Sequence, residues 1–140
     1  MGTYVTGPLR TGTGLDNTAA GGGEVVLSQT ALITFDATLV QNASFTLPAG
    51  AQIVDFYADV LTAYDSATSA TLSAGTASGG TQYLSSVSVK TAARRSNGFS
   101  AAQLAAMDDI GANTTLVATV TSVGQPTAGQ LRFTVLYVQK

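Results

Sequence analysis

Two carboxylates, Asp55 and Asp59, have a spacing from which a site geometry can be derived. Paired carboxylates hydrolyse glycosidic bonds when they lie about 5 to 9.5 Å apart. On one strand, Asp55 and Asp59 would share a face but lie about 13 Å apart, at about 3.3 Å per residue. The pair therefore does not fit hydrolysis. Tyr57 lies between the two, and the three side chains predict an exposed polar face that either meets solvent or binds a partner.

The sequence contains no Cys, no His and no Trp. Disulfides, Cys/His zinc sites, Ser-His-Asp catalysis and Cys-His catalysis are therefore excluded. A lysine-assisted serine nucleophile needs a motif such as S-x-x-K. Val87 and Tyr137 stand in place of that serine before Lys90 and Lys140. These residue types predict a protein that is not an enzyme and binds no cofactor.

Three further acidic residues, Asp65, Asp108 and Asp109, have two alternative interpretations, and calcium binding is the first of these. Calcium takes several oxygen ligands, and the sequence has no D-x-[DN]-x-[DN]-G loop to supply them. Asp108 and Asp109 also end a predicted helix, where negative charge is unfavourable. The other alternative is that the carboxylates of Asp108 and Asp109 pair with Arg94 or Arg95 of the same or a neighbouring subunit. We expect no metal site.

Lys90, Arg94 and Arg95 form the main basic cluster in a chain of 6 basic and 8 acidic residues, with a net charge of −2. Nucleic-acid binding needs a basic stripe that displaces counterions from phosphates, and aromatic residues on which bases stack. The cluster has neither, so we expect no nucleic-acid partner. It is either an ordinary surface loop or a contact with an acidic neighbour.

The mean hydropathy and residues 1–8 predict where in the cell the protein is located. The mean hydropathy is +0.27, yet no stretch approaches the roughly 20 apolar residues that span a bilayer. Residues 1–8 lack the basic and apolar regions of a signal peptide. The sequence therefore predicts a soluble product made in the cytoplasm, without a membrane partner.

Alternation of apolar and polar residues predicts strands along most of the chain. The expected strands are residues 25–35, 38–47, 53–61, 69–76, 83–90, 113–123 and 131–138, with one or two strands in the first of these. Within residues 53–61 the apolar side chains should face the core, opposite Asp55, Tyr57 and Asp59. These apolar residues are Val54, Phe56, Ala58 and Val60.

One short helix is expected at residues 100–107, where Ser100 and Gln103 have capping-box spacing and Gly111 follows. Residues 94–98 predict a polar turn, and residues 124–129 predict the loop of a β-hairpin between the last two strands. About eight short strands separated by Gly, Pro and Asn turns predict an all-β fold. We expect residues 24–140 to form an antiparallel β-sandwich of jelly-roll-like type.

Residues 1–23 differ from the rest because repeated glycines and one proline interrupt any regular pattern. They nevertheless carry apolar, aromatic and basic side chains that a purely flexible linker would not need. These are Tyr4, Val5, Leu9 and Arg10. The segment is either a disordered tail or an extended arm that becomes ordered against a neighbouring molecule.

Several phrases of the sequence together resemble small virion structural proteins of tailed bacteriophages, the kind that decorate or cement the capsid shell. The phrases are residues 3–10, 45–53, 72–83, 101–104 and 135–139. The resemblance implies a β-rich, often trimeric protein on the capsid surface that bridges major capsid subunits, with an extended terminal arm. It implies no catalytic residues.

On this basis we expect a capsid decoration or cement protein whose partners are the major capsid protein and further copies of itself. The expected contact residues are Tyr4, Val5, Leu9, Arg10, Arg94 and Arg95. The alternative is a carbohydrate- or receptor-binding module of a head or tail fibre that uses the face of Asp55, Tyr57 and Asp59. Against it, the chain lacks Trp and only 7% of its residues are aromatic.

Overall fold

The computed structural model describes residues 25–96 and 98–139 of the 140-residue chain. Eight strands and one helix form in this part of the chain. In chain order they are β1 (Val26–Thr34), β2 (Val40–Leu47), β3 (Gln52–Thr62), β4 (Ser69–Gly75), β5 (Leu84–Ser88), β6 (Arg94–Arg95), α1 (Ala101–Asp108), β7 (Thr114–Val123) and β8 (Gln130–Val138). The predicted arm, residues 1–23, lies outside the described residues, so its boundary stays a prediction.

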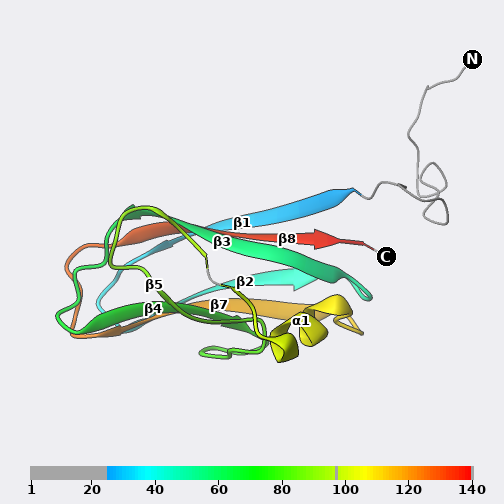
Figure 1. Ribbon diagram of the computed structural model, residues 1–140. Coiled ribbons are helices and arrows are strands. Elements are labelled where there is room, and N and C mark those ends of the chain that lie inside the picture. The colour runs from blue at the N-terminus through cyan, green and yellow to red at the C-terminus, as the bar shows by residue number, and fades with distance from the viewer. Residues whose placement is uncertain (1–24, 97, 140) are drawn as a thin grey trace, which may run out of the picture.

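The strands form two four-stranded sheets that pack face to face as a sandwich (Figure 1). The sheet orders are β1-β8-β3-β6 and β2-β7-β4-β5, and every described pairing is antiparallel. This is the strand order of a jelly roll, in which most successive strands pass from one sheet to the other, while β4 and β5 pair within one sheet. The predicted eight-strand antiparallel sandwich is confirmed. β8 is central, because it pairs with β1 on one side and with β3 on the other.

The predicted hairpin of the last two strands is wrong. β7 and β8 belong to opposite sheets, and residues 124–129 cross between them. Sheets of a sandwich lie about 10 Å apart, a gap that this long loop spans and a two-residue turn would not. The crossing is packed into the body, because Pro126 and Gly129 are both buried. Phe35 donates its backbone N–H to the Gly129 carbonyl at 3.0 Å.

The alternation in β3 holds except at its start. A register shift lies between Ile53 and Asp55, so one residue is inserted there relative to β8. Such a bulge reverses which face the next side chains occupy. Ile53 is therefore 3% exposed and Val54 is 45% exposed. The prediction that Val54 lines the core is wrong, whereas the inward positions of Phe56, Ala58 and Val60 are confirmed.

The predicted turn at residues 94–98 begins with a strand. Arg94 and Arg95 form β6, which pairs with Asp59 and Ala58 of β3. A strand of two residues is too short to show any periodicity of its own. Its conformation is set by the neighbouring strand, so it cannot be recognised from local sequence.

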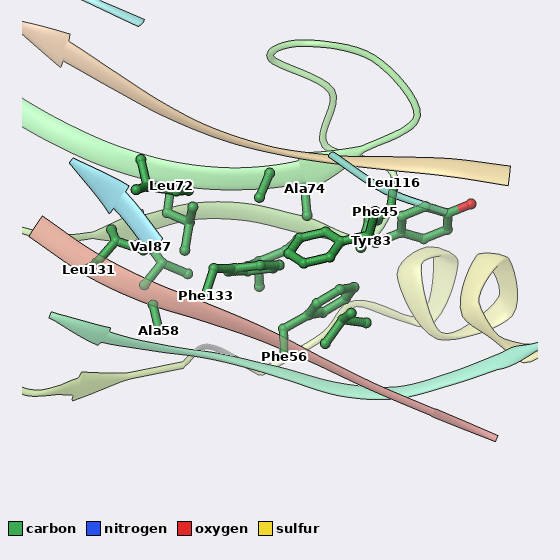
Figure 2. Close-up of a cluster of buried hydrophobic side chains, with 14 of the residues drawn as sticks. Phe45, Phe56, Ala58, Leu72, Ala74, Tyr83, Val87, Leu116, Leu131 and Phe133 are labelled. Atoms are coloured by element: carbon green, nitrogen blue, oxygen red, sulfur yellow. The ribbon is translucent and has the colours of Figure 1, made fainter. Parts of the chain in front are cut away.

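The core lies between the two sheets, and three aromatic rings occupy its centre (Figure 2). Phe133 of β8 is fully buried, and its ring centroid lies 5.6 Å from that of Phe56 and 5.8 Å from that of Phe45. Phe45 belongs to β2 and Phe56 to β3, so the cluster joins both sheets. Tilted and offset rings at this separation are favourable arrangements for aromatic side chains.

Helix α1 lies at one end of the sandwich (Figure 1) and begins as the sequence predicts. Gln103 donates its backbone N–H to Ser100 Oγ at 3.2 Å, and Ser100 donates its own N–H to Gln103 Oε1 at 2.9 Å. This is the predicted capping box. Met107 is buried against the sandwich. Among the described residues, no helix is long and apolar enough to cross a membrane.

The edge strands differ in how well they are protected. β6 is very short, and β5 contains Ser86 with a φ of +52° next to a register shift in its pairing with β4. Short strands and irregular geometry discourage pairing with another chain. β1 has nine residues and contains neither a charged residue nor a proline. β2, the edge strand of the other sheet, likewise contains neither a charged residue nor a proline, so these two are the least protected edges in the described part of the chain.

Candidate interaction surface

A straight row of four side chains crosses the outer face of the β1-β8-β3-β6 sheet. The register places Leu32 of β1 opposite Arg132 of β8, Arg132 opposite Asp59 of β3, and Asp59 opposite Arg94 of β6. Directly opposite residues in a sheet have Cβ atoms about 4.5–5.5 Å apart. We call Leu32, Arg132, Asp59 and Arg94 the arginine row.

Asp59 is the centre of the row and accepts hydrogen bonds from both arginines. Arg94 donates from Nε to Oδ1 at 2.6 Å and from its terminal nitrogen to Oδ2 at 3.1 Å. Arg132 donates to Oδ2 at 3.2 Å. The hydrogen bond from Arg94, assisted by Arg132, holds the pKa of Asp59 below its usual value, although burial opposes this effect. The carboxylate therefore stays ionised at neutral pH.

Tyr57 fixes the position of Arg94 from a second direction. The Arg94 guanidinium carbon lies 4.2 Å from the centroid of the Tyr57 ring, which is a cation–π contact. The same guanidinium donates one hydrogen bond to each carboxylate oxygen of Asp59. This bidentate geometry is the one that arginine forms best with a carboxylate. Arg94 is thus held by a ring and a carboxylate that both come from β3.

The row presents positive charge to the surroundings. The side chains of Arg94 and Arg132 are 65% and 49% exposed, whereas that of Asp59 is 14% exposed. One covered carboxylate therefore faces two accessible guanidinium groups. The whole chain has a net charge of −2, so the local sign is opposite to that of the molecule.

Two separate sequence predictions meet in this row. The sequence predicts an exposed polar face of Asp55, Tyr57 and Asp59, and it predicts that Arg94 contacts a neighbouring subunit from a loop. The structure brings Arg94 onto Tyr57 and Asp59. Asp55 lies apart from this contact, where its Oδ1 accepts the Phe56 N–H at 2.8 Å beside the bulge.

Arg95 is not part of the row. It pairs with the core residue Ala58, so strand alternation directs it to the other side of the sheet. The other predicted contact residues, Tyr4, Val5, Leu9 and Arg10, lie outside the described residues.

Neither Arg132 nor Leu32 is among the contact residues that the sequence predicts. Arg132 is a single charged residue between the buried residues Leu131 and Phe133. Such a charge inside an apolar strand marks an outward position, and this is the signal that could have found it. Its partnership with Asp59, 73 residues away, has no signal in the sequence.

The outward face is less suited to sugars than the sequence alone indicated. Arg94 covers one face of the Tyr57 ring, and Asp59 is engaged by two arginines. A sugar platform needs an open aromatic face and free polar groups beside it. These internal contacts occupy the groups that a carbohydrate would use.

Asp65, Asp108 and Asp109, the three aspartates considered for calcium binding, accept hydrogen bonds from within the chain. The Thr127 hydroxyl donates a hydrogen bond to Asp65, and this bond is the main cause of the lowered pKa of Asp65. Asp65 also accepts the backbone N–H groups of Thr127 at 2.7 Å and Ala128 at 3.2 Å, which lower the pKa further. Asp109 accepts the Gly111 N–H at 2.8 Å, and Gln52 donates to Asp108 at 3.4 Å. Within the chain, Arg94 therefore pairs with Asp59 rather than with these two. Residues 25–96 and 98–139 contain no group of three His, Cys, Asp or Glu placed to hold a metal ion.

Comparison with protein-family models and with curated proteins gives no match. Among solved structures, a chain of "Cyanophage Pam1 capsid asymmetric unit" is similar to this chain, with a TM-score of 0.57 and 20% sequence identity. The match covers 99% of this chain and 94% of that chain, so the two are similar in length. At this level of identity the likeness shows the fold. The chain therefore shares its jelly-roll fold with one component of a phage capsid.

Proposed function

We propose that this chain is a structural protein of a bacteriophage virion, of the decoration or cement type, that binds the capsid surface between major capsid subunits. The observation that carries the proposal is the fold shared with a chain of similar length from the cyanophage Pam1 capsid asymmetric unit. The resemblance of several sequence phrases to small tailed-phage virion proteins supports it independently. In this role the protein acts by binding, without catalysis or a cofactor, after its synthesis in the host cytoplasm.

The surface supports a binding role. Arg94 and Arg132 are exposed, and Asp59 and Tyr57 hold Arg94 in one geometry. Rigid arginine and aromatic side chains are the residues most enriched at the energetic centres of protein interfaces. A shell repeats such contacts many times, so modest individual interfaces give a durable assembly.

We propose the major capsid protein and further copies of this chain as its partners, with a homotrimer as the favoured oligomer. A second copy or a capsid subunit would cover the uncharged edge of β1, which otherwise invites unspecific pairing. The proposed contact residues are Tyr4, Val5, Leu9, Arg10, Arg94 and Arg95. Nucleic acid and membrane are not proposed as partners.

Particle binding tests this function directly. Heads that lack the protein are mixed with the purified full-length chain, and bound protein is separated by sedimentation. We expect saturable binding and a higher temperature of DNA release from the decorated heads, measured with a DNA-binding dye. Protein that stays in the supernatant at every concentration would contradict the proposal.

Deletion of residues 1–23 tests the proposed arm. If residues 24–140 form the whole domain, the truncated protein keeps its β-type circular dichroism spectrum and its urea midpoint. Its binding to heads should weaken, because the contacts of Tyr4, Val5, Leu9 and Arg10 are lost. A truncated protein that unfolds would show instead that the segment belongs to the domain.

A further inference from the structure

We propose that the arginine row is a docking surface for a carboxylate-bearing segment of a partner protein in the particle. This inference rests on the proposed function and adds the surface and the chemistry of the contact. Six residues form the surface: Leu32, Arg132, Asp59, Arg94, Tyr57 and Leu61. Their charge, their fixed geometry and their apolar flanks each indicate what binds there.

The charge of the row favours an acidic partner. A guanidinium carries five N–H donors. Within the described part of the chain, Arg94 uses donors from two of its nitrogens and Arg132 from one, all directed at Asp59. Both arginines therefore keep donors on groups that are 65% and 49% exposed. A partner carboxylate would complete an alternating network in which two cations face two anions.

The geometry of the row lowers the cost of binding. Free arginine side chains lose rotamer entropy when a partner immobilises them at an interface, and this loss weakens binding. Arg94 is already held by the two oxygens of Asp59 and by the Tyr57 ring. Arg132 is held by Oδ2 of the same carboxylate. The donors that remain are thus presented in a defined direction before the partner arrives.

The apolar flanks favour a protein over a phosphate or a polyanionic sugar. Leu32 ends the row on β1 and is 58% exposed. Leu61 follows Asp59 on β3, beside a second register shift, and is 48% exposed. Protein interfaces combine arginine and aromatic residues with apolar contacts at the centre and polar groups around them. A segment that carries both carboxylates and aliphatic side chains matches all six residues.

Arg132→Gln is the test variant because it leaves the Asp59–Arg94 pair in place. Thr121→Glu is its matched control, since it lowers the net charge equally from an exposed position on β7, in the other sheet. We expect Arg132→Gln to weaken binding to heads about tenfold and to flatten its salt dependence. Thr121→Glu should bind within about twofold of the unaltered protein. Urea midpoints of both variants confirm that they fold.

A second pair of variants tests the apolar flank independently of charge. Leu32→Ser should weaken binding to heads with unchanged salt dependence. Leu104→Ser, which alters a residue 53% exposed on α1, should leave binding unchanged. Both variants replace an exposed leucine, so a difference between them reflects the place and not the chemistry of the change.

The outcomes separate the two proposals. If the unaltered protein binds heads and Arg132→Gln binds equally well at every salt concentration, the docking surface is wrong and the proposed function stands. If the unaltered protein does not bind heads, the proposed function fails and this inference fails with it. If Arg132→Gln instead dissociates an oligomer seen by sedimentation, the occupant is a second copy of this chain, which also overturns the proposal.

Discussion

At the scale of single residues, Tyr64 shows how burial controls a titratable group. Its side chain is 1% exposed, and its hydroxyl donates to the Ile33 carbonyl at 3.4 Å. Burial, with a smaller contribution from the charge of Asp36, raises the pKa of Tyr64 to about 12. The folded chain therefore keeps the phenolic proton at pH values where an unfolded chain has lost it.

The raised pKa of Tyr64 predicts a loss of stability in alkali. In the unfolded chain the phenol ionises near pH 10. Above that pH only the unfolded state gains from ionisation, so the free energy of unfolding falls by up to about 1.4 kcal/mol per pH unit until the folded pKa is reached. Urea denaturation from pH 8 to 12 measures this slope, and Tyr64→Phe should reduce it. A residual slope remains because burial also raises the pKa of Tyr83. An unchanged slope in Tyr64→Phe would contradict the assignment.

At the scale of elements, α1 depends on its capping box. Ser100→Ala removes the side-chain oxygen that accepts the Gln103 N–H. Loss of such a cap costs about 1 kcal/mol, and the free energy of unfolding should fall by that amount. Ser44→Ala is the control, since Ser44 is exposed on β2 and makes no side-chain hydrogen bond among the described residues. Equal urea midpoints for the two variants would mean that the cap does not stabilise the fold.

Some features of the strands and of the helix follow from local sequence patterns, whereas others depend on distant strands. The capping box and the inward positions of Phe56, Ala58 and Val60 are local patterns, and both predictions are confirmed. The bulge at Val54 and the strand of Arg94 and Arg95 depend on the register with distant strands. The local pattern of apolar and polar residues does not determine that register, so neither feature was predicted.

The candidate site could be predicted only in part for the same reason. Asp59 and Tyr57 lie on one strand, and alternation alone puts them on one face. Arg94 and Arg132 reach Asp59 across 35 and 73 residues of sequence. Their meeting follows from the order of strands in the sheet, which amphipathic patterns leave open.

At the scale of the whole molecule, stability depends on one shared core. Phe133 contacts aromatic rings from β2 and β3 and is fully buried. Phe133→Ala should lower the free energy of unfolding by about 3–5 kcal/mol through lost burial and a residual cavity. Leu104→Ala, at an exposed position on α1, should change it by less than about 0.5 kcal/mol. Urea denaturation of both variants checks this, and similar losses would contradict a single cooperative core.

The central place of β8 in its sheet determines when the arginine row can form during synthesis. Arg132 lies on this strand, the last of the described strands to leave the ribosome. β1 and β3 both pair with it, so the sheet that carries the arginine row cannot close while residues 130–138 are still being synthesised. A nascent chain thus has no finished arginine row, and any partner that binds this surface can do so only after translation has passed this strand.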